Sequence, residues 1–336
     1  MKKYQRLAQQ IISQIELGVW LPGDKLPSLR EQVASSGMSF MTVGHAYQML
    51  ESQGRIVARP QSGYYVASRP TAQQPAPPAQ VMRDEAVDIN TYIFDVLQAS
   101  RDPSVVPFAS AFPDPRLFPL QQLNRSLANV SKTATAMSVI ENLPPGNVDL
   151  RHAIARRYAQ QGMNISPEEI VITAGALEAL NLSLQAVTEP GDWVIVENPC
   201  FYGALQALER LKLKALSIAT DVREGIDLNA LEQALNDYPV KACWIMTNSQ
   251  NPLGFTLSPE KKAQLVALLT RHNVTLIEDD VYSELYFGRE KPLPAKAWDR
   301  QDMTLHCSSF SKCLVAGFRI GWVAAGKHAR RIQQLQ

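Results

Sequence analysis

A proline-rich stretch near residue 70 limits how this chain of 336 residues can fold. From Ser68 the sequence reads SRPTAQQPAPPAQ, with prolines at 70, 75, 77 and 78 and almost no large apolar side chains. Such a segment cannot bury enough surface to offset the entropy of ordering it, and it favours extended, polyproline-like conformations. We therefore interpret residues 68–85 as an interdomain linker. It separates a head, residues 1–67, from a body, residues 86–336, and the length suits two domains.

The head shows helical patterns followed by a strand pair. Ser28 to Glu31 has the form of a capping box that opens a helix ending at Gly37, and Ser39 is placed as the N-cap of the next helix. Residues 56–58 and 64–66 flank a Pro-Gln-Ser-Gly turn and predict a β-hairpin wing. Two short helices broken by a glycine-containing turn form a helix-turn-helix. That shape occurs both in DNA-binding heads and in small helical packing domains.

Charge is distributed unevenly between the two parts. Residues 1–67 carry seven Lys and Arg against four Asp and Glu, whereas the remainder carries 26 against 28. A weakly basic head on a nearly neutral body suits a nucleic-acid contact confined to the head. The sequence has no run of about 18 apolar residues, so we expect no membrane span. The four cysteines lack paired spacing, which predicts reduced cytosolic thiols and no metal site.

The run from Pro22 to Val66 resembles the GntR-type winged helix along its whole length, from the Pro-Gly-Asp turn to the wing glycine. The resemblance implies that the helix opened by Ser39 enters the major groove of a double-stranded DNA operator, while the wing tip near Gly63 approaches the minor groove. Phe40 and Gly44 depart from the family, which frequently has arginine there, so guanine contacts are not expected at these points. The matching positions nominate five DNA-binding residues: Ser28, Arg30, Ser39, Thr42 and Gly63.

Apolar runs alternate with helical patterns through the body, which predicts an α/β domain with a mainly parallel sheet covered by helices. Ligands of such sheets bind beyond the carboxyl ends of the strands. Chemically suggestive segments follow the runs there: 173–177, 197–203, 247–254, 277–282 and 307–312. Each segment alone has an ordinary explanation as a strand-to-helix turn, core aromatics, a solvated acidic cluster or a surface lysine.

Together and in this order, the segments resemble the fold-type-I aminotransferases that depend on pyridoxal 5′-phosphate (PLP). The resemblance spans about residues 140–325 and includes Asn-Pro-x-Gly from Asn251, Asp-x-x-Tyr from Asp279 and Ser-x-Ser-Lys from Ser309. It implies PLP as cofactor and Lys312 as the catalytic residue that forms the Schiff base.

The resemblance also assigns the rest of the cofactor site. Asp279 would keep the pyridine nitrogen protonated, with Asp280 as a neighbour, and Phe201 would stack on the ring. Asn251 and Tyr282 would bind the phenolic oxygen. The phosphate would be bound by Arg319, Ser309 and the backbone of Gly175, Ala176 and Leu177.

Head, linker and body together resemble the MocR-type subfamily of GntR regulators, and the segment FASAFPDPRLFP at residues 108–119 strengthens the likeness. The resemblance implies a cytoplasmic homodimer in which PLP, alone or with an amino compound, changes how the heads meet DNA. Two alternatives stay open: a working class I/II-like aminotransferase with an incidental head, and a PLP carrier without a DNA role.

Two departures weigh against assuming enzymatic activity. Residues 141–143, Glu-Asn-Leu, stand where many relatives have a tyrosine that reaches the phosphate of a neighbouring subunit. Only 24 residues follow Lys312, so we expect the body to lack the C-terminal small subdomain that anchors a substrate carboxylate. We interpret the end as a truncation, in the natural product or in the expressed chain. The operator, the effector and the direction of regulation are left open.

Overall fold

The computed structural model describes residues 2–67, 113–140 and 142–336, and between 93 and 111 only residues 93–95, 98, 102, 104, 106 and 111. The chain divides into two compact units, Met1–Ala76 and Pro77–Gln336. The predicted linker, residues 68–85, lies outside the described residues, so its bounds stay predictions. Glu141 and most of residues 108–112 lie outside them as well.

The head begins with α1 (Lys3–Glu16) and has the two helices and the wing that the sequence predicts: α2 (Leu29–Ser36), α3 (Phe40–Ser52), β1 (Ile56–Arg59) and β2 (Gly63–Val66). Ser28 accepts from the N–H of Glu31 at 3.3 Å, and the Glu31 carboxylate accepts from the N–H of Ser28 at 2.7 Å, so the predicted capping box is confirmed. Gly37 ends α2 with a φ of 64°. Ser39 caps α3, as predicted, and its Oγ accepts from the N–H of Thr42.

One apolar core holds the head together. Tyr47 lies at its centre, fully buried, and its hydroxyl donates to the carbonyl of Pro27 at 2.8 Å. β1 and β2 pair antiparallel, with Ile56 opposite Val66 and Arg59 opposite Gly63. The two strand ends that pack into the core therefore fix the hairpin, while its turn projects away as a wing. The buried apolar side chains are Leu7, Ala8, Ile11, Ile12, Leu26, Val43, Ala46, Tyr47, Leu50, Ile56 and Val66.

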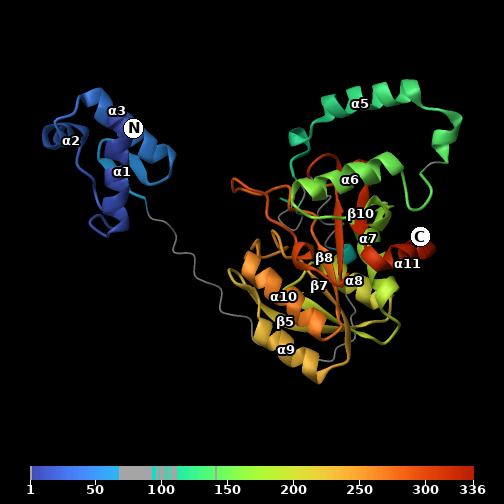
Figure 1. Ribbon diagram of the computed structural model, residues 1–336. Helices are drawn as coiled ribbons and strands as arrows, with labels where there is room; N and C mark the ends of the chain where they lie inside the picture. Colours follow the sequence, from blue (N-terminus) through green and yellow to red (C-terminus); the bar gives the residue numbers. More distant parts are fainter. Residues whose placement is uncertain are drawn as a thin grey trace. The chain divides into compact units, whose positions relative to one another are not determined.

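The body is built on an eight-stranded sheet with the strand order β3-β10-β9-β8-β7-β4-β5-β6 (Figure 1). The strands from β5 through β4, β7 and β8 to β9 pair in parallel, and only β10 and the short β6 run against their neighbours. The prediction of a mainly parallel sheet is confirmed. The strand bounds are β3 (Ile170–Thr173), β4 (Trp193–Asn198), β5 (Lys214–Asp221), β6 (Gly225–Ile226), β7 (Val240–Ile245), β8 (Thr275–Asp279), β9 (Thr304–Ser309) and β10 (Gly321–Ala324).

Helices cover both faces of this sheet, which makes three layers. Successive strand residues enter different clusters: Val194 and Val196 pack with α7, α8 and α11, whereas Ile195 packs with α9 and α10. Burial on both faces explains why the strands read as unbroken apolar runs. The helix bounds are α5 (Leu120–Thr133), α6 (Val148–Gln160), α7 (Ala176–Val187), α8 (Tyr202–Arg210), α9 (Leu228–Asp237), α10 (Pro259–Arg271) and α11 (Ala329–Leu335).

Short 3-10 turns connect these elements: η1 (Pro115–Leu117), η2 (Ala136–Val139), η3 (Pro167–Glu169), η4 (Ala295–Trp298), η5 (Ala316–Phe318) and η6 (Gly326–His328). Because β3 and the strands from β9 to β5 all run in one direction, their carboxyl ends meet at one edge of the sheet. Among the described residues, none of the helices combines the length and the apolar character needed to cross a bilayer.

Candidate functional site

The loop after β3 and the segment that leads into β10 meet at this edge and bring Gly175 against Arg319. Gly175 caps α7 with a φ of 91°, and a Cβ built on it would lie 2.7 Å from Nη2 of Arg319. Only glycine leaves the guanidinium that space. The guanidinium also donates to the carbonyl of Ala174 at 3.2 Å. Gly321 closes the opposite side, where a Cβ would lie 2.6 Å from the amide nitrogen of Ala176.

This corner has the features of an anion site. Ala176 and Leu177 belong to the first turn of α7, whose N–H groups have no acceptor within the helix and carry the positive end of its dipole. Arg319 adds a full positive charge. Ser309 ends β9, is buried, and pairs with Gly321 in the sheet. Glu178 already binds one N–H of the turn, that of Ala174 at 2.5 Å. The structure therefore brings together five of the sequence-predicted positions: Gly175, Ala176, Leu177, Ser309 and Arg319.

A second group lies around the end of β8. Asp279 is 2% exposed, and its Oδ1 is buried without a hydrogen-bond partner in the described part of the chain. Burial, together with the charge of Asp280, raises the pKa of Asp279 to about 7. Lys312 Nζ donates to the carbonyl of Ala111 at 3.1 Å and lies 5.5 Å from the ring centroid of Tyr282. Burial lowers the pKa of Lys312, and the charge of Asp279 opposes that change.

Tyr282 links this group to the loop after β7. Burial raises the pKa of Tyr282 to about 12, the charge of Asp279 adds to the rise, and the side chain of Asn251 opposes it by hydrogen bonding. Four predicted cofactor residues, Asp279, Lys312, Tyr282 and Asn251, thus form one neighbourhood. Phe201 stands at the N-cap of α8, and the centroid of its ring lies 4.7 Å from that of the Tyr202 ring. The Phe201 ring also lies against Gly203, since a Cβ built on Gly203 would be 2.7 Å from Cζ of Phe201.

A buried carboxylate that the sequence reasoning missed also lies at this edge. Glu197, on β4, accepts from the N–H of Met246 at 3.0 Å, and its Oε1 is buried with no partner in the described residues. Burial raises the pKa of Glu197 to about 8, and the charge of Asp279 adds to the rise. The position of Glu197 within an apolar strand could have identified it from the sequence. Burying a carboxylate is costly, so a carboxylate in a buried strand indicates a functional or structural role.

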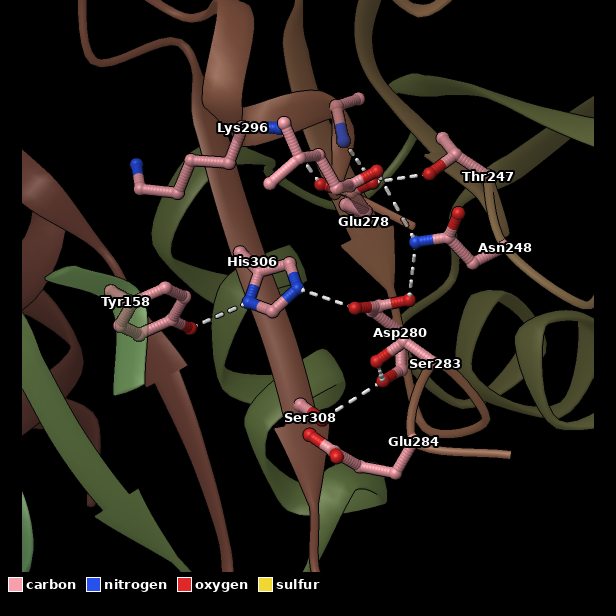
Figure 2. Close-up of polar contacts among 12 residues, drawn as sticks. Tyr158, Thr247, Asn248, Glu278, Asp280, Ser283, Glu284, Lys296, His306 and Ser308 are labelled. Atoms are coloured by element: carbon pink, nitrogen blue, oxygen red, sulfur yellow. Dashed lines mark hydrogen bonds and ion pairs between the residues drawn. The ribbon is translucent and has the colours of Figure 1, made fainter. Parts of the chain in front are cut away.

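A chain of buried hydrogen bonds holds the neighbouring Asp280 (Figure 2). His306 Nε2 lies 2.9 Å from Oδ2 of Asp280, and His306 Nδ1 lies 2.6 Å from the hydroxyl of Tyr158. Trp322 Nε1 donates to that hydroxyl at 2.9 Å. Every donor in this chain has an acceptor when His306 is neutral and carries its proton on Nε2. Burial opposes ionisation of Asp280, but the hydrogen bond from His306 holds the pKa of Asp280 below its ordinary value.

The same chain continues into the loops that frame the site. Asn248 Nδ2 donates to Oδ1 of Asp280 at 2.9 Å, and Lys262 Nζ donates to Oδ1 of Asn248 at 2.6 Å. Glu278 accepts from the N–H groups of Ala295 at 2.6 Å and Lys296 at 3.0 Å, and from the hydroxyl of Thr247 (Figure 2). These bonds join β8, β9, α6 and α10. They hold the end of β8, and with it Asp279, in one position.

An open cleft of about 590 Å³ adjoins the group around Tyr282. Asn251 and Tyr282 line one part of it, Ala111, the acceptor of Lys312, lines another, and the rest is largely apolar, with Leu285, Tyr286 and Phe287. Clefts of this size that combine an apolar lining with a few polar groups commonly bind small molecules.

In the head, the predicted residues lie on two helix starts and the wing. Ser39 Oγ and Thr42 Oγ1 are 2.9 Å apart at the start of α3. Ser28 and Gly63 line a common cleft of about 610 Å³, although the Ser28 side chain is already used as the cap of α2. Arg30 is exposed on the first turn of α2. Gly63, with a φ of 110°, begins the second strand of the wing.

Comparisons with known proteins agree with this division into two parts. Residues 3–66 match the gntR family of bacterial regulatory proteins, and residues 119–336 match the class I and II aminotransferases. The HTH-type transcriptional regulator YdcR of Escherichia coli K12 is 83% identical over 336 residues, and its relative YjiR of the same organism is 38% identical over 338 residues. This chain covers 72% of the length of each of the two regulators, and they match 100% of this chain.

A solved structure extends the likeness to the body. The kynurenine aminotransferase of Pyrococcus horikoshii, solved in complex with PMP, matches with a TM-score of 0.67 and 27% identity over 73% of this chain. The chain spans 62% of that aminotransferase, which is less than two thirds of its length. Members of the class I and II aminotransferase fold family use PLP, and the described site lies at the sheet edge where such ligands bind. The chain therefore belongs to the HTH-type transcriptional regulators that join a GntR-type DNA-binding domain to an aminotransferase-like domain, the MocR-type layout that the sequence predicts.

Proposed function

We propose that this chain is a DNA-binding transcription regulator that holds PLP covalently on Lys312. The observation that carries the proposal is the unpartnered Oδ1 of Asp279, which is buried in the neighbourhood of Lys312 and Tyr282. A buried carboxylate without a partner is costly, and a protonated ring nitrogen would satisfy it. When bound, PLP supplies a ring that accepts electrons from a substrate carbon.

The residues around the ring fit this group. Lys312 is a suitable attachment point because its burial lowers the pKa of the amine and favours the neutral, nucleophilic form. The side chains of Asn251 and Tyr282 would bind the phenolic oxygen. Phe201, at the N-cap of α8, would stack on the ring.

The residues around the phosphate fit it as well. Gly175 leaves room for the guanidinium of Arg319, and the N–H groups of Ala176 and Leu177 point from the helix end. The hydroxyl of Ser309 would add a donor. An anion at this corner would thus meet a positive charge, a helix dipole and free backbone donors together.

The attachment is tested by spectroscopy and mass spectrometry on the purified chain. PLP addition is expected to produce a visible absorption band, and borohydride is expected to fix a PLP adduct on the peptide that contains Lys312. The Lys312→Ala variant should lose both signals, while Lys327→Ala, at an exposed lysine near the end of the chain, should keep them. A wild-type chain that takes up no PLP, or a Lys312→Ala variant that keeps the adduct, would remove PLP from the proposal.

The head supplies the DNA contact in this proposal. Ser39 and Thr42 would lie in the major groove with α3, Ser28 and Arg30 would contact the backbone or base edges nearby, and the wing at Gly63 would approach the minor groove. Arg30→Ala is expected to weaken binding to an operator selected from random duplexes, measured by gel shift. Arg271→Ala, on α10 of the body, is the matched control. Equal affinity of Arg30→Ala and wild type would remove Arg30 from the contacts.

A homodimer is part of the proposal, and α5 supports it. None of the residues of α5 is buried in the described structure, yet Leu120, Leu123, Leu127 and Val130 repeat at heptad spacing along one side. A second copy of the chain would cover this stripe. Light scattering of the wild type should give twice the chain mass. Leu127→Asp should lower the measured mass to that of a single chain, whereas Asn129→Asp, on another side of α5, should leave it unchanged.

We also propose that a DNA-binding regulator of this kind acts in the cytoplasm.

PLP would regulate DNA binding only if it binds one arrangement of the protein more tightly than another. A footprint on the selected operator, run with and without PLP, tests this step. Protection that is identical in both conditions would refute the sensor role and leave DNA binding intact.

The cleft beside Asn251 and Tyr282 favours a second candidate, a working aminotransferase, because an amino compound held there would lie beside Ala111, whose carbonyl accepts from Lys312. Turnover of an amino donor by the purified chain would support it, and specific DNA binding without turnover would favour the regulator.

A further inference from the structure

The first turn of α3 exposes two large apolar side chains to solvent. Phe40 is 54% exposed and Met41 is 67% exposed, while Val43, Ala46, Tyr47 and Leu50 on the same helix are completely buried. The core of the head is thus filled without the first two residues. Neither side chain is among those that pack against that core in the described residues. An exposed pair of this kind at a helix start indicates a contact surface.

The exposed side of α3 carries no cation that could read guanine. The helix, FMTVGHAYQMLES, contains no lysine or arginine, and all seven cations of residues 1–67 lie elsewhere in the head. Gly44 follows Phe40 by one turn and faces open space, since nothing lies within 4 Å of a Cβ built on it. His45 packs edge-on against the ring of Tyr4 at 5.9 Å. The start of α3 therefore presents Phe40 and Met41 as its large exposed side chains, beside the hydroxyls of Ser39 and Thr42, which are hydrogen-bonded to each other.

One feature of the DNA major groove matches this surface. Among the four base pairs, the C5 methyl of thymine is the apolar group displayed there, and apolar side chains contact it. The N-terminal residues of a recognition helix are the ones that reach base edges. Cations outside α3, such as Lys25 and Arg59, are suited to contact DNA phosphates, and such contacts position the protein without carrying sequence information.

We propose that Phe40 and Met41 read thymine methyl groups in the major groove of the operator, so that each half-site contains thymine where the family frequently reads guanine. This inference rests on the proposed DNA-binding function, with α3 as the helix that enters the groove. It assigns a specificity role to two residues that the five predicted DNA contacts do not include.

The test changes the DNA rather than the protein. An operator is first selected from random duplexes with the full chain, and each thymine is then replaced in turn by deoxyuridine, which pairs identically but lacks the methyl group. Loss of one buried methyl is expected to weaken binding about fourfold at one or two positions in each half-site. Replacing the same base pair by one with 5-methylcytosine in place of thymine should restore part of the apolar contact.

Protein variants identify which side chain makes the contact. Phe40→Ala and Met41→Ala should bind the thymine operator more weakly and should no longer respond to deoxyuridine at the position that each one reads. Leu17→Ala is the matched control, because Leu17 is another exposed apolar residue of the head, at the C-cap of α1 and outside the proposed DNA contacts. Phe40→Arg should shift the selected base from thymine towards guanine. Circular dichroism checks that each variant is folded.

The outcomes separate the two levels of the claim. Selective duplex binding that ignores every thymine methyl refutes the inference and leaves the DNA-binding function standing. A chain that selects no duplex refutes the DNA-binding function, and the inference falls with it. Exposed Phe40 and Met41 would then have a protein partner as their remaining explanation.

Discussion

Replacing Asp279 by asparagine should change how the stability of the PLP-free protein depends on pH. Burial and the charge of Asp280 raise the pKa of Asp279 from 3.8 to about 7 in the folded protein. The folded protein therefore holds this proton more tightly than the unfolded chain does. The stability that the protonated carboxyl contributes is complete below pH 3.8 and is lost as the pH rises through about 7. Asparagine has the same shape and cannot ionise, so it removes this loss.

The expected size follows from the difference between the folded and unfolded pKa of Asp279. A tenfold change in proton affinity corresponds to about 1.4 kcal/mol, so ionising Asp279 across the whole window costs about 4 kcal/mol of the free energy of unfolding. Little is recovered by solvent screening, because the side chain is almost fully buried. Glu197 also titrates, near pH 8, and Asp279→Asn removes a charge that adds to this raised pKa. The difference between the two proteins is therefore read at pH 7 and below, where Glu197 is protonated in both folded proteins.

Urea denaturation between pH 4 and pH 8, followed by tryptophan fluorescence, measures the effect. Four of the five tryptophans lie in the body, at 193, 244, 298 and 322, so the signal reports the relevant unit. Wild type should fall below Asp279→Asn by the stated amount as the pH rises, and saturating PLP should reduce the gap. Asp221→Asn is the control, since backbone hydrogen bonds lower the pKa of that exposed carboxyl and place its titration below this window. Parallel curves for wild type and Asp279→Asn would refute the reasoning.

Three further predictions concern single contacts. Tyr158→Phe should lower the free energy of unfolding, measured by urea denaturation, by about 3 kcal/mol, because Trp322 Nε1 loses its acceptor and His306 Nδ1 loses its donor. The control is Tyr238→Phe, whose ring packs on Trp193, and it should change the free energy of unfolding little. Gly175→Ala should weaken PLP uptake about tenfold in an absorbance titration, since a methyl group would displace Arg319. The control is Gly162→Ala, because Gly162 has a similar positive φ but faces open space. Weaker uptake by the control as well would indicate general backbone strain instead. Asp227→Ala should lower the free energy of unfolding by about 1 kcal/mol, because the Asp227 carboxylate caps α9 through the N–H groups of Asn229 at 2.9 Å and Ala230 at 3.2 Å. A Tm equal to that of Asp237→Ala, at the other end of α9, would contradict this prediction.

Much of the architecture could be predicted because its signals are local. Caps such as Ser28 and Ser39 act within one helical turn, and apolar spacing identifies the buried side of each helix. Parallel strands that alternate with helices must end at one edge of a sheet, so the residues that follow each strand could be expected together before any distance was known. The two groups around Arg319 and around Asp279 occur at that edge.

The contacts that distinguish neighbouring residues depend on parts of the chain that are far apart. Asp279 and Asp280 are adjacent in sequence, yet only Asp280 has His306 and Asn248 as partners, and only Asp279 keeps an unpartnered oxygen in the part of the chain that is described. Tyr158, which completes the chain of hydrogen bonds to His306, lies 148 residues away from it. No periodicity or cap records such a pairing.

The sequence by itself determined the two-part layout, the helix caps, the parallel sheet and the set of residues at its carboxyl edge, since each of these follows from local spacing or from chain direction. Only the tertiary structure decided that Gly175 receives the guanidinium of Arg319, that an oxygen of Asp279 has no partner among the described residues, and that Phe40 and Met41 stay in solvent. The physical reason is that burial and hydrogen bonding are properties of surfaces in contact, and these surfaces come from segments that only the packed sheet and helices bring together.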